Sequence, residues 1–452
     1  MSKVAQTAAA HNGTTKGGAA HNGKATTHPG SPAAIDWPEF NDLSIHGPAG
    51  ALVEAIYPHS EADRAALLTQ TLAAFGNCIG RTAHWCIEGD RHYCNLFVAL
   101  VGATSKGRKG SSWSHIRRFF EGLDPDWEKH RVRGGLSSGE GLVWAVRDPI
   151  YKKQLVGDKG DKHYEDVLVD EGVKDKRLLC LEPEFSSVLK AMGREGNILS
   201  GQLRDLWDGR HCIETLVKNS PARATDAHGS VIAHTAAEEL RRFLTSTEQA
   251  NGLANRFIWC LVRRSKCLPF GGQPDNFTME TIRLKFLDAL AFARDQGAID
   301  FDDEAREYWA RIYPALSEGK PGLSGAMVGR AEAQVRRMAT IYSLLDQQKA
   351  VNFVHLWAAE LLWRYAEESV FAIFGRTVGD PDADEILLAL KSRPSGMTRE
   401  DIRLLFSGHR SSDLIERALE LLAAHKLVHG KKSPTGGRPE TRWLAGPEPE
   451  PE

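Results

Sequence analysis

A turn rich in glycine, basic residues and hydroxyls occupies residues 101–113, VGATSKGRKGSSW. These are the residue types of a phosphate-binding loop, in which backbone N–H groups converge on the anion and a lysine adds positive charge. The spacing differs by one residue from the usual G-x-x-x-x-G-K-[ST], because counting from Gly102 puts Arg108 where the lysine belongs. A shift of one residue places Lys109 on the phosphates, and Gly110 then becomes an additional residue in the loop.

We predict that Lys109 contacts the β- and γ-phosphates of a nucleotide, and that Ser111 is a magnesium ligand with Ser112 as its substitute. The alternative is a basic surface turn between a strand and a helix. The predicted phosphate-site residues are Gly102, Ser105, Gly107, Arg108, Lys109, Gly110, Ser111 and Ser112.

Carboxylates that could serve a bound magnesium ion or an attacking water lie in two later segments. RLLCLEPEF (177–185) is an apolar strand that ends in Glu182 and Glu184, where a nucleotide-hydrolysing core keeps the acid that holds the metal. In GGLSSGEGL (134–142), a helix is expected to begin at Ser137 or Ser138, with Glu140 in its first turn. Glu140 could orient the water, or it could be an ordinary carboxylate favoured by the helix dipole.

Polar residues also mark two further predicted strands. SVIAHTAAEEL (230–240) ends its strand with His234 and Thr235, which could sense the γ-phosphate. The alternative for His234 is a hydrogen-bonded core histidine. Arg256 precedes an apolar strand, and could either neutralise charge in a neighbouring subunit's active site or form a structural salt bridge.

Five apolar segments between residues 95 and 262 are the predicted strands that position these side chains. They are NLFVALV, HRVRGG, RLLCLE, GSVIAHT and RFIWCLV. Helical patterns alternate with them, so the rhythm predicts an α/β core with a mostly parallel sheet. Glu140 would lie next to the phosphate turn if the corresponding strands are neighbours.

The chain of 452 residues is long enough for two or three domains. Residues 1–35 contain almost no large apolar side chains, which predicts a disordered tail. The expected units after it are N-terminal helices with a hairpin (36–94), a nucleotide-binding core (95–270), a helical domain (271–376), a last unit (382–445) and an acidic tail (446–452).

The balance of 59 acidic and 57 basic residues indicates no particular partner, so nucleic-acid binding would require local basic patches. Seven cysteines without a C-x-x-C pair predict reduced thiols. No apolar run approaches the length of a membrane span, and no secretion signal is recognisable. We therefore expect a soluble, cytoplasmic protein.

The last unit has the pattern of a winged helix. Its three amphipathic helices are expected at about 382–391, 398–406 and 411–424, followed by a basic, glycine-rich wing. The candidate DNA-binding residues are Arg410, Lys431, Lys432 and Arg438. Acidic residues on the third helix would repel phosphate, so a protein–protein winged helix is the alternative.

One further group could hold a zinc ion. His84, Cys86, His92 and Cys94 flank a predicted hairpin turn and could converge there. Their spacing matches no common zinc module, so we favour ordinary hairpin residues.

The order of these motifs resembles a poorly characterised family of P-loop ATPases of phage, plasmid and integrated-element replication modules, often found beside primase–polymerase domains. The likeness covers roughly residues 40–376. It rests on the ordered set GDRHYCNLFVALVGATSKGRKGSSW, GGLSSGEGL, LLCLEPEFSSVL, LRDLWDG, VIAHTAAEEL, GLANRFIW and RAEAQVRRMATIYSLLD.

More broadly, the layout is similar to that of RecA-like hexameric helicases. There, a glutamate after the second strand activates water, an acid ends the third strand and a polar sensor ends the fourth, which would correspond to Glu140, Glu182 and His234. A late arginine finger would correspond to Arg256. Aspartate is usual at the end of the third strand, whereas this chain has Glu182.

The resemblance implies an ATP- and Mg²⁺-dependent, helicase-like motor that assembles as a homo-oligomeric ring. It would act on single-stranded or forked DNA in mobile-element replication, with a primase or polymerase as a further partner. Two alternatives are an ATP-switched DNA-binding replication initiator with little turnover, and a non-catalytic adaptor that recruits a primase.

Overall fold

A parallel five-stranded sheet forms the centre of the fold. The computed structural model describes residues 37–103, 106–157, 162–215, 222–320, 322–375, 380–424, 427–433 and 440–446. The strands are β3 (Phe97–Val101), β4 (Val132–Arg133), β7 (Arg177–Glu182), β10 (His228–Thr235) and β11 (Phe257–Leu261). They lie in the order β11–β3–β10–β7–β4, and every neighbouring pair is parallel. All five coincide with predicted strands, so the predicted α/β core with a mostly parallel sheet is confirmed.

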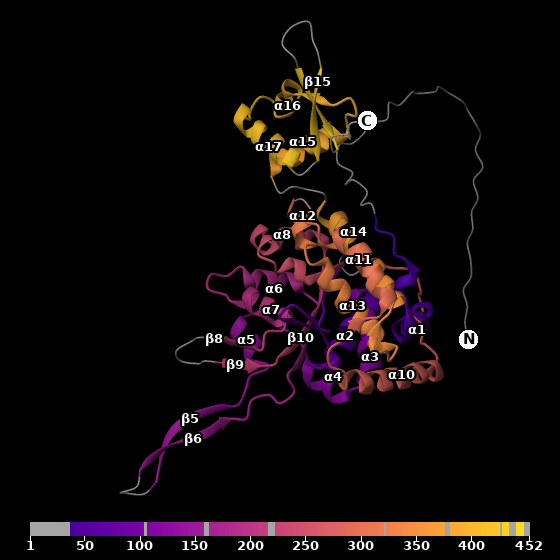
Figure 1. Ribbon diagram of the computed structural model, residues 1–452, viewed down its shortest axis with the longest axis vertical. Coiled ribbons are helices and arrows are strands. Elements are labelled where there is room, and N and C mark those ends of the chain that lie inside the picture. Colours follow the sequence, from indigo (N-terminus) through magenta and orange to yellow (C-terminus); the bar gives the residue numbers. More distant parts are fainter. Residues whose placement is uncertain are drawn as a thin grey trace, which may run out of the picture. The chain divides into compact units, whose positions relative to one another are not determined.

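Helices cover both faces of the sheet, which explains why β3, β10 and β11 are buried along their whole length. The helix α2 (Arg64–Ile79) covers one face, where it meets His234. The helix α7 (Leu199–Asp208) covers the other, where Leu206 lies 2.2 Å from the position that a Cβ atom on Gly229 would take. Because His234 and Gly229 are an odd number of residues apart, their side chains point to opposite faces. In Figure 1, β10 lies between these two groups of helices.

A buried asparagine on α2 connects three elements of this core. The Asn77 amide nitrogen lies 3.1 Å from the carbonyl oxygen of Leu178, 3.3 Å from that of His228 and 3.2 Å from the hydroxyl of Ser230. Its own oxygen accepts a 2.8 Å hydrogen bond from the indole nitrogen of Trp127. Asn77 therefore links α2 to both β7 and β10.

Helices and hairpins connect the strands of the sheet. Between β3 and β4 lie α3 (Lys109–Glu121) and α4 (Pro125–Arg131), and α5 (Gly139–Trp144) follows β4. Between β7 and β10 lie α6 (Phe185–Met192), α7, β8 (Cys212–Thr215) and β9 (Ala222–Thr225). Between β10 and β11 lie α8 (Ala237–Phe243), α9 (Ser246–Ala250) and the 3-10 helix η3 (Ala254–Arg256).

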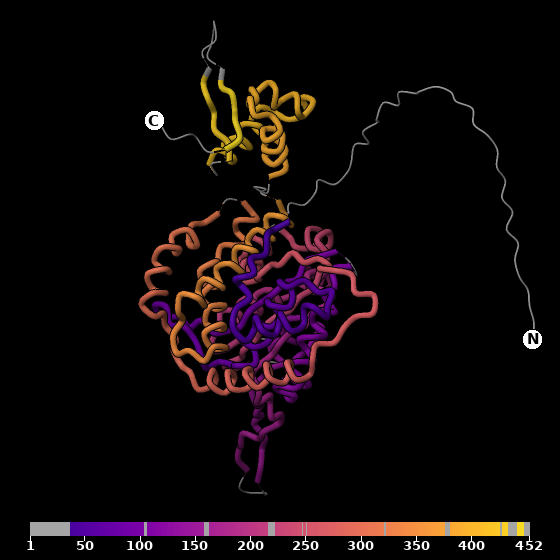
Figure 2. The backbone as a smooth tube through the Cα atoms, turned by 90° about the vertical axis from the view of Figure 1, so that its right-hand side faces the viewer, coloured from indigo at the N-terminus to yellow at the C-terminus, as the bar shows by residue number. Residues whose placement is uncertain are grey.

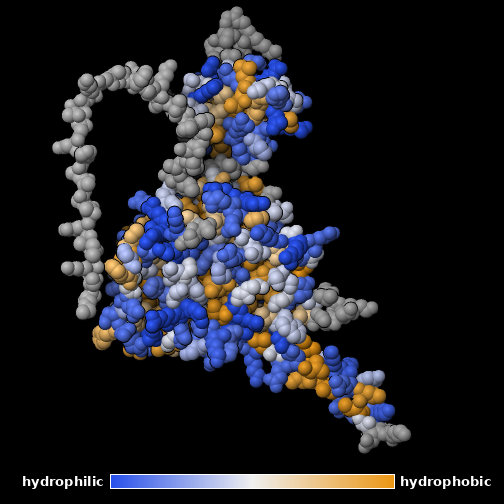
Figure 3. Space-filling view, turned by 180° about the vertical axis from the view of Figure 1, so that it is seen from behind, coloured by the Kyte–Doolittle hydropathy of each residue, from blue (hydrophilic) through white to orange (hydrophobic). Residues whose placement is uncertain are grey.

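A two-stranded antiparallel ribbon of β5 (Ile150–Val156) and β6 (His163–Asp170) follows α5 and precedes β7 in the sequence (Figure 1). This ribbon was not predicted. Tyr151 pairs with Leu168 and Leu155 with Tyr164, so these four side chains lie on one face. All four are exposed, Tyr164 to 71 %. Figure 3 shows hydrophobic colour along this ribbon. No residue of the two strands belongs to the buried core.

The N-terminal helices and the helical region share one hydrophobic core with the sheet, from Ala49 to Ile373. The N-terminal elements are the 3-10 helices η1 (Asp42–Ser44) and η2 (Tyr57–His59), the helices α1 (Gly47–Ile56) and α2, and the hairpin β1 (His84–Ile87) and β2 (Asp90–Tyr93). The later elements are α10 (Asn276–Arg294), β12 (Asp300–Phe301), α11 (Asp303–Ser317), α12 (Gly322–Met327), α13 (Ala331–Leu345), β13 (Ala350–Val351) and α14 (Phe353–Phe374). Figure 2 shows the orange helices beside the indigo N-terminal ones, which they contact.

The last unit has a hydrophobic core of its own. Its helices are α15 (Pro381–Lys391), α16 (Arg399–Leu405) and α17 (Ser412–Ala424), close to the predicted ranges. Its strands β14 (Met397–Thr398), β16 (Glu440–Ala445) and β15 (Val428–Ser433) form an antiparallel sheet in that order.

A helix that crosses a bilayer must be both long and apolar. Within the described part of the chain, no helix combines the length and the apolar composition that a membrane span needs. The predicted tail, residues 1–35, lies outside the described residues.

Candidate functional site

A cavity of about 300 Å³ lies at the carboxyl ends of β3, β7 and β10. We call it the turn cavity. Seven of the predicted site residues line it: Gly107, Arg108, Lys109, Gly110, Ser111, Glu184 and His234. Pro183, Thr235, Ala236 and Glu239 complete its wall. The sheet therefore gathers residues that are up to 132 positions apart in the sequence, from Gly107 to Glu239.

The helix α3 begins at Lys109, and its N-terminus faces this cavity. Arg108 precedes it with a φ of 52°, in the left-handed region, and no side chain caps the helix. The first N–H groups of an uncapped helix can donate to an anion, and the helix dipole favours negative charge there. A 2.5 Å ion pair with Glu61 holds the Arg108 guanidinium.

Glu61 was not identified from the sequence, although it anchors the turn. Its pKa is lowered to about 2, mainly because the backbone N–H of Leu268 and the guanidinium of Arg264 hydrogen-bond to the carboxylate, with a further contribution from Arg108. Glu61 therefore stays ionised and ties the unusual backbone of Arg108 to the segment that follows β11.

The ammonium group of Lys109 folds back onto its own turn. Its Nζ donates to the carbonyl oxygens of Gly102 at 2.8 Å and Ala103 at 3.2 Å. Burial lowers the pKa of Lys109, while the carboxylates of Glu239, Glu184 and Glu238 act in the opposite direction. Phosphate oxygens entering the cavity could replace the two carbonyl groups as acceptors.

The two candidate magnesium hydroxyls have different positions. Ser112 is fully buried, accepts a 2.8 Å hydrogen bond from the amide of Gln70 and donates a 2.6 Å hydrogen bond to the Lys109 carbonyl. Ser111 is exposed and lines the turn cavity. Ser112 therefore serves the packing of α2 against α3, and Ser111 is the hydroxyl placed for a ligand.

His234 is buried, at 3 % exposed, as the core-histidine alternative expects, and it also lines the turn cavity. Its Nε2 lies 3.3 Å from the amide oxygen of Gln70. Burial and the nearby charge of Lys109 lower the pKa of His234 to about 4, so the ring is neutral at pH 7. Gln70 links His234 to Ser112, a connection that sequence spacing does not reveal.

Two carboxylates lie at the turn cavity. Glu184 was predicted, whereas Glu239 was not, because an acidic pair at a helix start is equally typical of a dipole-favoured first turn. The hydroxyl of Ser186 donates a 3.4 Å hydrogen bond to Glu239. Glu239 stands in the first turn of α8, directly after the strand that carries His234.

Glu182 lines a different cavity from the one that contains Lys109. Its carboxylate accepts a 2.8 Å hydrogen bond from the backbone N–H of Leu136 and lines a separate cavity of about 140 Å³ formed largely by residues 133–138. Burial raises the pKa of Glu182, opposed by the N–H groups of Leu136 and Gly135. Glu182 and Lys109 therefore line different cavities.

Glu140 is also outside the turn cavity. It is exposed in the first turn of α5, and Ser138 caps that helix by accepting a 3.1 Å hydrogen bond from Gly141. Neither cavity includes Glu140 in its wall. The cap is Ser138, the second of the two expected helix starts, and the position of Glu140 agrees with the alternative of a helix-terminal carboxylate.

Arg256 adopts the salt-bridge alternative. It is 5 % exposed, forms a 2.7 Å ion pair with Asp208 and lies 5.5 Å above the ring of Trp207. The guanidinium is thus enclosed within its own chain.

One of the predicted DNA-binding residues of the last unit forms an ion pair within that unit, and two others are exposed. Arg410 forms a 2.8 Å ion pair with Asp382, whereas Lys431 and Lys432 are exposed on β15. Arg438 and, in the phosphate turn, Ser105 lie outside the described residues.

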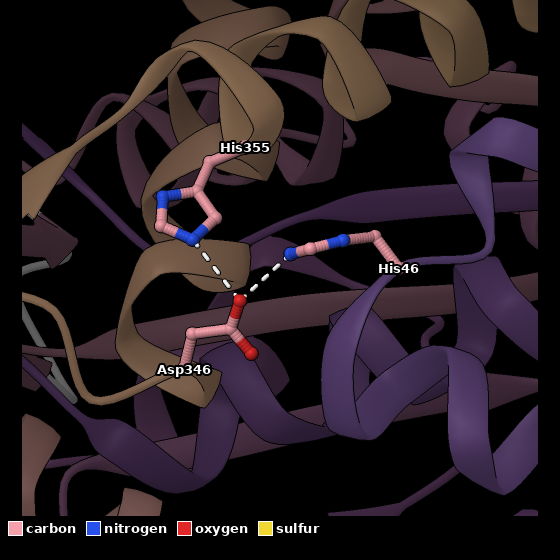
Figure 4. Close-up of side chains that lie close together, drawn as sticks. All are labelled: His46, Asp346 and His355. Carbon is pink, nitrogen blue, oxygen red and sulfur yellow. Dashed lines mark hydrogen bonds and ion pairs between the residues drawn. The ribbon is translucent and has the colours of Figure 1, made fainter.

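The hairpin histidines and cysteines do not converge on a zinc site. Trp85 pairs with His92 and Cys86 with Arg91, which puts His92 and Cys86 on opposite faces of the hairpin. Among the described residues, one group has the proximity of metal ligands, His46, Asp346 and His355 (Figure 4).

Hydrogen bonding explains that group without a metal. The backbone N–H of Asn352 donates to Nδ1 of His355 at 3.2 Å, so the ring proton lies on Nε2. This Nε2 donates to Asp346 at 3.1 Å, and Nε2 of His46 lies 2.7 Å from the same oxygen. The three side chains therefore form a hydrogen-bonded clamp that links the start of α1 and the start of α14 to Asp346 at the end of α13.

The donor set of the turn cavity fits a magnesium nucleotide. The Ser111 hydroxyl and the carboxylates of Glu184 and Glu239 are oxygen ligands of the kind that a hard cation prefers. Lys109 and the α3 N-terminus supply positive charge for phosphates. In comparisons with known proteins, no family model matches the chain and no curated sequence matches it.

Proposed function

We propose that the chain binds ATP with magnesium at the turn cavity, hydrolyses it, and acts on DNA as a helicase-like motor with a RecA-like core. The observation that carries this proposal is the convergence of Lys109, the uncapped N-terminus of α3 and two carboxylates at one sheet edge. In open α/β sheets, ligands bind outside the carboxyl ends of the strands.

The sheet order supports the RecA-like assignment. In chain order, β4, β7 and β10 are the second, third and fourth strands, and they lie side by side on one flank of β3. The motifs that end these strands therefore fall along a single edge, next to the turn after β3. The fifth strand, β11, flanks β3 on the other side.

The residues of the turn cavity suggest a division of roles. Lys109 and the α3 N–H groups bind the β- and γ-phosphates, and Ser111 with Glu184 holds the magnesium ion, which supplies charge neutralisation when bound. Glu184 or Glu239 orients the attacking water. Neutral His234 has a single ring N–H, which would leave the Gln70 amide oxygen and donate to the γ-phosphate. In this proposal Glu184 takes the place that the resemblance gives to Glu182.

A second candidate function is an ATP-switched, DNA-binding replication initiator with little turnover. The position of Glu182 and Glu140 favours it, because two carboxylates with expected catalytic roles lie outside the turn cavity. In either case we propose that the last unit is a winged helix whose exposed Lys431 and Lys432 contact DNA phosphates. For the first candidate function, the helicase-like motor, we further propose that copies of the chain assemble as a ring and that a primase or polymerase is a partner.

Phosphate release from ATP, with and without single-stranded and forked DNA, tests the proposal. Lys109→Ala should lower turnover at least about 100-fold, since it removes the charge that stabilises the transferring phosphoryl group. Lys106→Ala is the matched control, because Lys106 lies on the same turn, is exposed and does not line the cavity. Full turnover in the Lys109→Ala protein would overturn the assignment. Tight binding of a fluorescent ATP analogue without turnover would select the initiator.

A further inference from the structure

A third cavity, of about 630 Å³, lies beside the amino end of β10, at the sheet edge opposite the turn cavity. Four arginines line it, Arg81, Arg91, Arg210 and Arg330, together with two histidines. The acidic residues in its wall are Asp90, Asp208 and Asp226. We call it the arginine cavity.

Most of its charged groups are already paired. Asp208 forms a 2.7 Å ion pair with Arg256, and Asp226 lies 2.9 Å from the ring of His211 and 3.5 Å from Arg81.

Arg210 pairs with Asp205 at 2.8 Å. Arg330 has only a 3.6 Å contact with Asp208, which Arg256 already occupies. Arg91 is exposed and forms no ion pair within the described part of the chain. Arg91 and Arg330 are therefore the cations whose guanidinium groups can still donate hydrogen bonds to a ligand.

Further positive charge lies behind the cavity. Arg337 is buried and donates to the oxygens of Asn95 and to the carbonyl of Trp207 at 2.8–2.9 Å, with no carboxylate partner among the described residues. Asp208 interacts with this charge but forms no ion pair with Arg337. A buried cation without a direct ion-pair partner creates a positive potential. An anion in the cavity would reduce this cost.

His92 in the cavity wall responds to that potential. Burial and the charges of Arg337, Arg336 and Arg330 lower the pKa of His92 to about 4. Its Nδ1 is buried and has no hydrogen-bond partner among the described residues. The lowered pKa of His92 is therefore a second sign that positive charge is concentrated beside this cavity.

Guanidinium groups lie over two of the rings at or behind the cavity. That of Arg81 lies 4.2 Å from the ring centre of Tyr93, and that of Arg337 lies 3.7 Å from the ring of Trp207. The ring of His211 in the cavity wall is exposed and pairs with Asp226. Charge and hydrogen bonding dominate this wall, and a phosphoryl group presents the oxygens that guanidinium groups bind in pairs.

We infer that the arginine cavity is a binding site for a phosphoryl oxyanion, held by Arg91 and Arg330. The oxyanion comes either from the backbone of a nucleic-acid strand or from a free phosphate compound. The inference does not depend on ATP binding, because the two cavities share no residue and lie at opposite edges of the sheet.

The test uses two anions and a protein that carries Lys109→Ala, so that pyrophosphate binding at the phosphate turn is removed. Calorimetric titration with pyrophosphate tests for a free compound, and polarisation of a labelled oligo-dT strand at fixed salt tests for a backbone. Arg91→Ala and Arg330→Gln should each weaken binding about tenfold or more. Arg311→Ala, which removes an exposed arginine on α11, is the matched control.

The two arms distinguish the sources. A loss with oligo-dT, with a salt dependence reduced by about one ion per arginine, supports the strand backbone. A loss with pyrophosphate alone supports a free phosphate compound. Equal binding of both anions by the Arg91→Ala, Arg330→Gln and Arg311→Ala proteins would overturn the inference. Arg330→Lys keeps the charge but not the paired hydrogen bonds, so its affinity should lie between those of the unaltered and Arg330→Gln proteins. Unchanged urea unfolding of the variants excludes a folding defect as the cause.

Discussion

The backbone N–H of Leu136 donates a 2.8 Å hydrogen bond to the carboxylate of Glu182. This contact holds Glu182 against the loop after β4, while Glu184, two residues later, lines the turn cavity. The two glutamates, although two residues apart, therefore line different cavities, and we expect only Glu184 to act at the proposed nucleotide site.

The first prediction concerns this separation. Glu184→Gln should lower ATP turnover by roughly 100- to 10,000-fold if the carboxylate activates water or holds the metal. Glu182→Gln should lower the free energy of unfolding and change turnover less. Phosphate release and urea unfolding measure the two effects, with Glu140→Gln as the exposed control. The roles are reversed if Glu182→Gln abolishes turnover at unchanged stability.

The second prediction is a loss of stability in mild acid. Burial lowers the pKa of His234 to about 4 and that of His228 to about 3, below the ordinary value of 6.5. Between pH 6.5 and 4, the unfolded chain binds protons that the folded chain does not, so stability falls as the pH falls. Each histidine lowers the free energy of unfolding by at most about 1.4 kcal/mol for each unit by which the pH falls.

Urea unfolding from pH 7 to pH 4.5 measures this dependence. His228→Gln should flatten it, whereas replacement of the exposed His211 should not. An unchanged slope in the His228→Gln protein would show that other groups dominate the acid response.

The third prediction concerns Arg256. Because its ion pair with Asp208 is buried, Arg256→Ala should lower the free energy of unfolding by about 3 kcal/mol. If Arg256 acted on a neighbouring subunit instead, mixing Arg256→Lys and Lys109→Ala proteins would restore some ATP turnover. We expect no restoration in the mixture, measured by phosphate release against each variant alone.

The fourth prediction concerns the clamp of His46, Asp346 and His355. Burial alone would raise the pKa of Asp346, but hydrogen bonds from His355 and His46 hold it well below its usual value. Asp346→Asn should lower the melting temperature by several degrees, because a charged hydrogen bond contributes about 1.5–3 kcal/mol. Added Zn²⁺ should not raise the melting temperature of the unaltered protein, in contrast to the expectation for a metal site.

The fifth prediction uses the ribbon of β5 and β6. Replacing residues 151–169 with a short Gly-Ser linker should change the melting temperature by less than about 2 °C, because the ribbon adds nothing to the buried core. Its exposed apolar face should instead affect association between molecules. Mass photometry of both proteins measures that effect, and a large fall in melting temperature would contradict the prediction.

The sheet was predictable because β3, β7, β10 and β11 are short, mainly apolar runs. NLFVALV and RFIWCLV are buried on both faces, and such strands read as continuous apolar segments. The helices of the last unit were predictable for a similar reason, since their apolar residues recur at helical spacing. The ribbon was missed because its apolar residues alternate with lysine and acidic residues and pack against nothing.

The site was predictable in position but not in detail. Strand ends place Lys109, Glu184 and His234 at one edge, which sequence order indicates. The direction of a carboxylate depends on a local hydrogen bond, such as that between Leu136 and Glu182. The pairing of Arg256 with Asp208 joins residues 48 positions apart, and a single sequence contains no signal for it.

The buried amide of Asn77 has a consequence for the opposite end of the molecule. Because it spans the amino-terminal halves of β7 and β10, it fixes how far one strand can slide along the other. The relative position of the two strands in turn fixes the distance between Glu184 and His234, which lie at the opposite ends of these strands from Asn77. We therefore expect that a smaller residue at position 77 would change the spacing of Glu184 and His234 at the turn cavity, although neither of these residues is altered.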